Sequence, residues 1–185
     1  GEELNLSGEQ LGFINSMWFL GFPISMVIGG LVYHTVGGKR IMQFALLAHA
    51  LGIVLTIYSG SYAGLLISTL FIGLGNGCTE AACNPMIADM FPNNKTTMLN
   101  KFHVWFPGGL VIGSLIAFFV GDALGWQLLI ATMIIPTIIY GVMIFNVEFP
   151  KTQYLESNTG ENLKASFGSS DNRLRCDLRT CAVPA

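Results

Sequence analysis

Residues 70–92, with the sequence LFIGLGNGCTEAACNPMIADMFP, set polar side chains inside a long apolar segment. Asn76, Glu80 and Asn84 recur every four residues, so on a helix they share one face. A neighbouring stripe of small residues has the same spacing: Gly73, Gly77 and Ala81. A carboxylate in the hydrocarbon core of a membrane costs at least ~2.5 kcal/mol. We therefore expect Glu80 to have a polar partner, a water-filled cavity or a functional role.

The composition around this segment is that of a membrane protein. The chain has 185 residues, of which 52% are hydrophobic and only 11% charged, whereas soluble domains contain about 25% charged residues. Between residues 10 and 147 the few charged residues are Lys39, Arg40, Glu80, Asp89, Lys95, Lys101 and Asp122. These charges fall mostly in predicted turns, which is typical of a polytopic bundle of transmembrane helices. The predicted fold class is therefore all-α.

Several function classes find no support in the sequence. The net charge is −2 and no basic run is present, so we expect no nucleic acid as a partner. The four cysteines lack the spacing of metal ligands, and we expect Cys78 and Cys83 to be small packing residues. Motifs for a serine or cysteine nucleophile are also missing, and Gly73–Gly77 lacks the context of a nucleotide loop. We predict neither enzymatic activity nor a cofactor.

Five apolar segments are long enough to cross a bilayer, at about residues 11–33, 41–58, 63–90, 96–120 and 126–145. They form a predicted transmembrane domain over residues 11–147, with a polar start at 1–10 and a disordered tail at 148–185. The basic residues of the turns fall on one side of the membrane: Lys39, Arg40, Lys95, Lys101 and Lys151. By the positive-inside rule this side is cytoplasmic, which places the start of the chain outside and the tail inside.

Glu80 and His103 are the leading candidates for a functional pair. Each lies two to three turns from the loop that joins the third and fourth spans, so the two side chains can meet at a similar depth. A paired Glu and His can relay a proton or bind a solute. The alternative for Glu80 is a structural hydrogen-bond anchor, and for His103 a hydrogen bond to a backbone carbonyl.

The other polar and aromatic residues of the spans also have two interpretations. Asn76 and Asn84 can bind hydroxyl groups or hold Glu80 by hydrogen bonds. Trp18 and Trp105 can stack on the ring of a ligand or belong to the packed core. We expect His49, which stands alone in the second span, to be structural.

The helical hairpins with a short basic turn resemble the major facilitator superfamily. Members carry a glycine-rich loop after the second helix, of the form G-x-L-x-D-x-x-G-R-K. The corresponding residues are Gly30, Gly37, Lys39 and Arg40, with His34 at the place of the acid and Gly38 at that of the first arginine. The resemblance implies that Gly37, Lys39 and Arg40 belong to a loop that takes part in conformational change.

A second set of residues is similar to the fucose–proton symporter family and related sugar permeases. It comprises Cys78-Thr-Glu80-Ala-Ala-Cys-Asn84-Pro85, then Leu99-Asn100 and Gly109. This resemblance implies that Glu80 couples protons and binds the sugar, with Asn84 beside it. It also implies that His103 helps to form the sugar site, where the family has an amide. Phe106 stands at the position of a second sugar-binding amide.

The resemblance further implies that the five spans are helices two to six of a twelve-helix transporter. We then expect a fragment whose native amino end is missing, and whose partners are the missing helices, membrane lipid, a proton and a small sugar-like solute. The expected function is proton-coupled symport in the plasma membrane or an inner membrane. The alternative is a non-transporting membrane interaction protein that pairs with other helices through the stripe of Gly73, Gly77 and Ala81.

Overall fold

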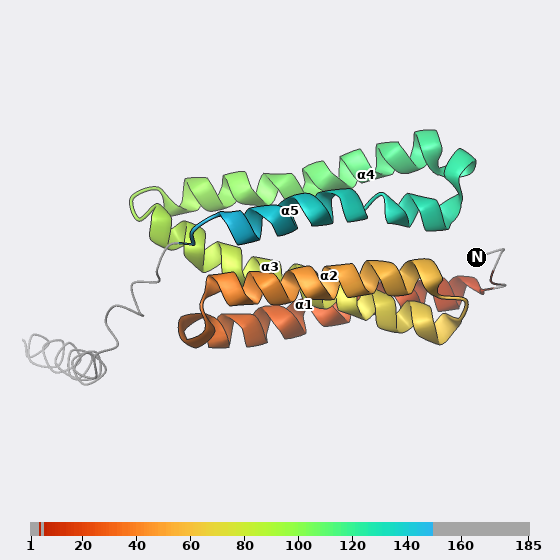
Figure 1. Ribbon diagram of the computed structural model, residues 1–185, viewed down its shortest axis with the longest axis horizontal. Coiled ribbons are helices and arrows are strands. Elements are labelled where there is room, and N and C mark those ends of the chain that lie inside the picture. Colours follow the sequence, from red (N-terminus) through yellow and green to blue (C-terminus); the bar gives the residue numbers. More distant parts are fainter. Residues whose placement is uncertain (1–3, 5, 150–185) are drawn as a thin grey trace, which may run out of the picture. The chain divides into compact units, whose positions relative to one another are not determined.

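The computed structural model describes residue 4 and residues 6–149, and the regular elements of this part are all helical (Figure 1). They are α1 (Gly8–Val36), α2 (Gly38–Tyr58), α3 (Tyr62–Met90), α4 (Lys95–Ala131) and α5 (Ile134–Asn146). The tail that we predict to be disordered, residues 148–185, lies outside the described residues except for its first two, and so does Lys151.

Five stretches of these helices are long and apolar enough to cross a membrane. They are Gly8–Val36, Gly38–Tyr58, Tyr62–Met90, Lys95–Phe119 and Gly125–Asn146. The prediction of an all-α polytopic bundle with five membrane-spanning segments is therefore confirmed.

The beginning of α1 follows from its first polar residues. The Ser7 hydroxyl accepts a hydrogen bond of 3.2 Å from the backbone N–H of Gln10, and the Ser7 N–H donates one of 2.9 Å to Gln10 Oε1. This reciprocal capping box gives acceptors to two backbone N–H groups, those of Ser7 and Gln10, which have no partner within the helix. The helix then continues through Pro23 to Val36.

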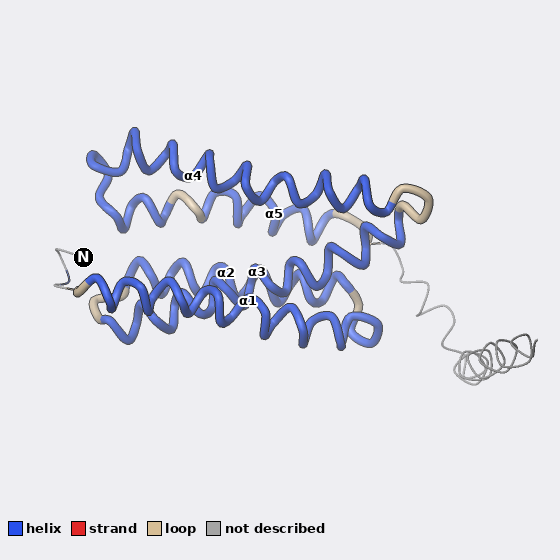
Figure 2. The backbone as a smooth tube through the Cα atoms, turned by 180° about the vertical axis from the view of Figure 1, so that it is seen from behind, coloured by secondary structure: helices blue, strands red, loops and turns tan. Residues whose placement is uncertain are grey.

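The last two spans are divided differently from the sequence prediction. The expected turn at residues 121–125 reduces to a reversal at Gly125, whose φ of 71° and ψ of 162° are not helical. The expected fifth span is in turn interrupted after Ala131, and α5 begins at Ile134 (Figure 2). Pro136 explains this break, because a proline cannot donate to the carbonyl four residues earlier, at Thr132, and clashes with it.

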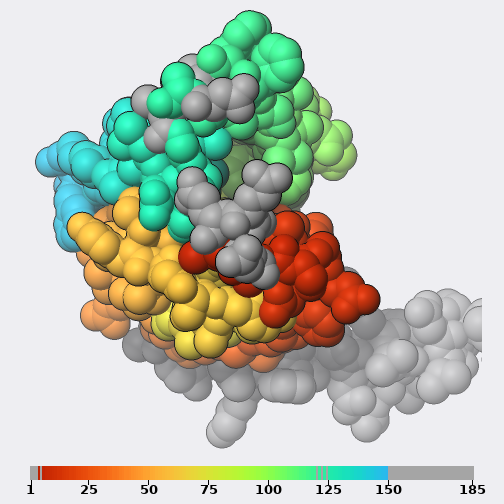
Figure 3. All heavy atoms as spheres, turned by 90° about the vertical axis from the view of Figure 1, so that its right-hand side faces the viewer, coloured from red at the N-terminus to blue at the C-terminus, as the bar shows by residue number. Residues whose placement is uncertain are grey.

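α3 lies at the centre of the first three helices and packs against both α1 and α2. Gly73 lies against Trp18, Gly77 against Phe22, and Ala81 against Gly29. Since these numbers rise together on both helices, α1 and α3 run in the same direction. In Figure 3 the atoms of α4 and α5, coloured green to blue, lie beside those of α2 and the start of α3, coloured orange to yellow.

The small residues of α3 are required by the close approach of α1. A Cβ added at Gly73 would clash with the backbone oxygen of Trp18, and one at Gly77 would clash with that of Phe22. Membrane helices associate through such close packing, because lipid gives no hydrophobic drive to bring them together. The stripe is thus occupied by α1, which removes the basis for a partner chain binding there.

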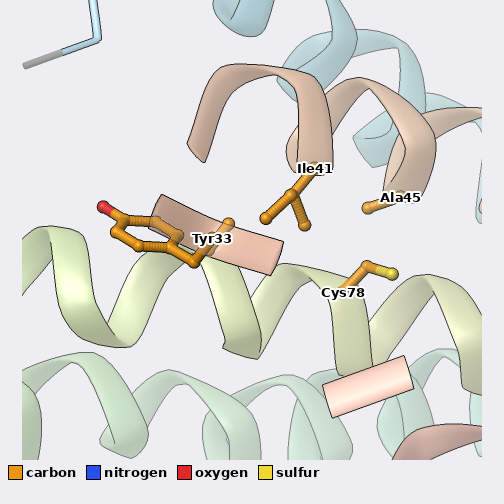
Figure 4. Close-up of a cluster of buried hydrophobic side chains, with 5 residues drawn as sticks. Tyr33, Ile41, Ala45 and Cys78 are labelled. Atoms are coloured by element: carbon orange, nitrogen blue, oxygen red, sulfur yellow. The ribbon is translucent and has the colours of Figure 1, made fainter. Parts of the chain in front are cut away.

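A compact cluster of buried side chains joins α1, α2 and α3 near the α1–α2 turn (Figure 4). Its members are Tyr33, Ile41, Ala45, Cys78 and Ala82. Cys78 and Cys83 are both buried free thiols, which agrees with their predicted packing role. This cluster fixes the position of the middle of α3, where Glu80 lies.

Candidate functional site

Glu80 lies on α3 with its side chain 17% exposed. The amide Nδ2 of Asn84 donates a hydrogen bond of 2.8 Å to Glu80 Oε2. The two residues are one helical turn apart, which is the spacing that lets side chains of one helix face meet. The sequence pattern therefore predicted this contact from local geometry.

His103 approaches the other oxygen of the same carboxylate from α4. Its Nδ1 lies 3.7 Å from Glu80 Oε1, and its side chain is 49% exposed. This distance is longer than a hydrogen bond but short enough for an ion pair when the imidazole is protonated. The structure thus brings together Glu80, Asn84 and His103, which we call the Glu80 cluster.

The Glu80 cluster contains a polar atom without a partner. The amide oxygen Oδ1 of Asn84 is buried and accepts no hydrogen bond from any residue that the structure describes. A buried acceptor left unpaired costs about 1–3 kcal/mol. Asn84 donates its amino group to Glu80, so its carbonyl oxygen is the acceptor of the cluster that has no partner among the described residues.

Aromatic rings from α1 and α4 lie next to each other, and one of them is a helical turn from His103 in sequence. The rings of Trp18 and Phe106 are nearly parallel, with centroids 6.4 Å apart, and Trp18 also stacks on Phe22 at 5.6 Å. Phe106 follows His103 by three residues on α4, so the two share a helix face. Trp105, in contrast, is 75% exposed and takes part in no contact of this kind that the structure describes.

Asn76 belongs to a different set of hydrogen bonds. Its Oδ1 lies 3.3 Å from Nε2 of His49 on α2, and Nδ1 of His49 lies 2.8 Å from the hydroxyl of Tyr140 on α5. We call these three residues the His49 cluster. We expected Asn76 to accompany Glu80, but its side-chain oxygen lies next to His49 on α2 instead.

Sequence reasoning missed Tyr140 and undervalued His49. His49 is the one histidine of α2, and Tyr140 is the one tyrosine of α5. Their isolation in apolar segments was the available signal. Pairing them, however, required knowing that residues 91 positions apart meet in space.

The predicted conformational loop is reduced to Gly37 between α1 and α2, and Lys39 and Arg40 lie in the first turn of α2. Gly37 has φ 85° and links the two helices. The ammonium group of Lys39 lies 6.0 Å from the centroid of the Phe149 ring. Arg40 lines one end of an otherwise mostly apolar groove between α1, α2 and α3.

Metal chemistry has no support in the described part of the chain. Within residues 4 and 6–149, no group of three or more His, Cys, Asp or Glu side chains is placed to hold a metal ion. The Glu80 cluster offers instead one carboxylate, one imidazole and one amide. These groups can exchange a proton and form hydrogen bonds with a small polar molecule.

Comparison with known proteins agrees with this architecture. The family model of the Major Facilitator Superfamily matches residues 1–173. The chain is 27% identical over 172 residues to the cis,cis-muconate transport protein of Acinetobacter baylyi, covering 89% of this chain and 41% of that protein. It is 24% identical over 176 residues to the hexuronate transporter of Bacillus subtilis, covering 90% of this chain and 42% of that protein.

A more distant relative is the chloroplastic sodium-dependent phosphate transport protein 1 of Arabidopsis thaliana, 28% identical over 92 residues, which are 49% of this chain and 18% of that protein. No solved structure matches the chain at a significant level. The chain spans about two fifths of the length of the first two relatives.

These three relatives carry the names of transport proteins rather than of enzymes. The family match covers most of the chain, and the five apolar helices have the length and composition of membrane spans. The chain is therefore an integral, multi-pass membrane protein that belongs to the Major Facilitator Superfamily.

Proposed function

We propose that this protein takes part in proton-coupled transport of a small, sugar-like polar solute. The observation that carries the proposal is the Glu80 cluster: an intramembrane carboxylate held by Asn84 at 2.8 Å and approached by His103 at 3.7 Å. Ionisable residues inside membrane helices are costly, and they mark ion pathways and proton relays. Glu80 is the coupling acid in this proposal, and His103 is its relay or solute-binding partner.

The names of two relatives suggest a solute that carries a carboxylate. A hexuronate is a sugar acid, with hydroxyl groups and one carboxylate, and muconate is a dicarboxylate. In a sugar acid the carboxylate would pair with the protonated imidazole of His103. A hydroxyl group would donate a hydrogen bond to Oδ1 of Asn84, the buried acceptor without a partner. The stacked rings of Trp18 and Phe106 would pack against the apolar face of the sugar.

This arrangement links solute binding to proton binding through charge. Glu80 and a protonated His103 together carry no net charge. A solute carboxylate competes with Glu80 for the His103 cation, which leaves Glu80 without a counter-charge. Since an uncompensated carboxylate inside a membrane is costly, binding of one proton to Glu80 offsets that cost. The solute and the proton then bind together.

The remaining parts of the proposal concern the whole transporter. Solute sites in such folds lie at the interface between repeated halves, so we propose that further helices of the same transporter complete the site. The loop at Gly37, Lys39 and Arg40 would move as the protein changes conformation. Its basic residues would face the cytoplasm and anionic lipid of a plasma membrane or an inner membrane.

The test is binding by this chain in lipid nanodiscs, with D-glucuronate as the probe and D-glucose as the uncharged control. The pH is varied from about 5 to about 8, the range in which histidine changes charge. Saturable binding of glucuronate that strengthens at low pH, with a dependence on pH that is reduced in Glu80→Gln, supports the proposal. Equal binding of both sugars at every pH would argue against a charge-coupled site, and it would leave Glu80 outside the mechanism.

A further inference from the structure

The His49 cluster joins three helices through one side chain. His49 on α2 reaches Asn76 on α3 through Nε2 and Tyr140 on α5 through Nδ1. The imidazole also packs directly on α3, because a Cβ added at Gly75 would come within 2.5 Å of its Cδ2. The ring thus lies against α3 at Gly75, and its two nitrogens have separate partners.

The partners determine where the protons of the cluster lie. Asn76 meets His49 with its carbonyl oxygen, which can only accept a hydrogen bond. Nε2 of His49 must then carry the proton and donate. In the neutral ring Nδ1 is an acceptor, so the Tyr140 hydroxyl donates to it. The hydrogen bonds run in one direction, from Tyr140 through His49 to Asn76.

The same geometry fixes the Asn76 carboxamide. Because the Asn76 oxygen lies next to His49 on α2, the amino group Nδ2 is the part of the carboxamide that remains for another hydrogen-bond partner. Asn76 precedes Glu80 by four residues, so both side chains project from the same face of α3. The Glu80 cluster already presents two acceptors, the carboxylate of Glu80 and the buried oxygen of Asn84. A donor one turn away complements them.

We propose that His49 is a positioning residue, which holds the Asn76 amide so that its amino group serves as a hydrogen-bond donor for the solute beside Glu80. This inference rests on the proposed solute site and adds a specificity residue to it. A sugar acid offers hydroxyl and ring oxygens as acceptors besides the carboxylate that pairs with His103, and the Asn76 amino group supplies a donor for one of them. His49 itself does not touch the solute.

The first experiment is a double-mutant cycle on glucuronate binding in nanodiscs. We expect His49→Ala and Asn76→Ala each to weaken binding by about tenfold, the size of one hydrogen bond. The double variant should bind as weakly as Asn76→Ala alone, because His49 acts through Asn76. Effects that multiply to about a hundredfold, or a His49→Ala variant that binds normally, would overturn the inference.

Tyr140→Phe is the matched control. It removes the hydroxyl that reaches Nδ1 but leaves the contact between Nε2 and Asn76 in place. Its thermal stability should fall while its affinity for glucuronate stays within about twofold of the wild type, less than one hydrogen bond is worth. A loss of affinity as large as that of His49→Ala would mean that general loosening of the bundle, rather than Asn76, explains the effect.

The second experiment reads the proton positions without any ligand. Because the sequence has three histidines, ¹⁵N-histidine NMR of the whole chain can be assigned by substituting each histidine in turn. We expect His49 to be the neutral Nε2–H tautomer, and Asn76→Leu to remove its preference for that form. A protonated ring or the Nδ1–H tautomer would overturn the inference even if glucuronate binds.

The two experiments separate this inference from the proposed function. If the wild type binds no glucuronate but His49 is the Nε2–H tautomer, the proposed solute site fails, and so does the role of Asn76 as a solute donor. If glucuronate binds with the expected pH dependence but the cycle is multiplicative, the solute site stands and His49 is not its positioning residue.

Discussion

Asn84 and Glu80 are joined by a hydrogen bond of 2.8 Å from Nδ2 to Oε2, one helical turn apart on α3. The bond orients the carboxylate so that its other oxygen, Oε1, lies 3.7 Å from His103 on α4. Glu80 thus has one partner on its own helix, Asn84, and a second partner on α4, His103. The His103 side chain is half exposed. The fixed contact suits a structural role, and the exposed contact is the one that a proton or a solute can change.

Replacing Glu80 by Gln should reduce the pH dependence of glucuronate binding. Glutamine keeps an oxygen that can accept from Asn84 but cannot gain or lose a proton, so the fold should be retained. Affinity should vary less than in the wild type between about pH 5 and about pH 8, because a histidine partner still changes charge over this range but residue 80 no longer exchanges a proton. Asp89→Asn, which alters an exposed carboxylate near the end of the same helix, is the control and should behave like the wild type. A Glu80→Gln variant with unchanged pH dependence would contradict the proposal.

Changing His103 should separate charge from hydrogen bonding. His103→Lys keeps a positive charge at every pH in this range, so glucuronate should still bind, with a weaker dependence on pH. His103→Gln removes the charge and should weaken glucuronate binding by about tenfold, the effect of one lost charged contact of about 1.4 kcal/mol. Its binding of uncharged D-glucose should not change. Equal losses for glucuronate and glucose in His103→Gln would show that His103 supports the fold and does not recognise a carboxylate.

Asn84→Asp should make stability depend on pH. The substitution places a second carboxylate one turn from Glu80 and removes the amide donor. At neutral pH the two charges repel and the bundle should lose about 1–3 kcal/mol of stability. As the pH falls, one proton shared between the carboxylates removes the repulsion, so the thermal midpoint should rise toward the wild-type value. Asn84→Leu, which adds no charge, should show no such recovery. A midpoint of Asn84→Asp that is the same at both ends of the pH range would mean that the two carboxylates do not interact.

Gly77→Ala should destabilise the packing of α1 on α3. A Cβ at this position clashes with the backbone oxygen of Phe22 and the hydroxyl of Ser25, so the helices must move apart at a cost of about 1–3 kcal/mol. The measurement is the thermal midpoint in detergent. Gly113→Ala is the control, because a Cβ there meets nothing within 4 Å, and its effect should stay within about 1 kcal/mol. Equal stability of the two variants would show that the close approach is not needed.

The amino-acid sequence by itself was sufficient for the features that depend on local periodicity. The apolar runs predicted five membrane-spanning segments, and all five are present. The spacing of four between Glu80 and Asn84 predicted a shared helix face, and their side chains are hydrogen bonded. Ser7 and Gln10 form the capping box at the start of α1, three residues apart in the chain. Each of these depends on residues within one or two turns of each other, where helix geometry alone fixes the distances.

Other features depend on which helices are neighbours, and the sequence pattern does not contain that information. The same spacing of four predicted that Asn76 would join Glu80, but α2 offers Asn76 a nearer partner in His49, which is also held by Tyr140 of α5. The small stripe was compatible with a partner chain or with an internal helix, and only the tertiary structure showed that α1 occupies it. Periodicity tells which side chains share a face. The packing of α1, α2 and α4 against α3, and of α5 against α2, decides what each face meets.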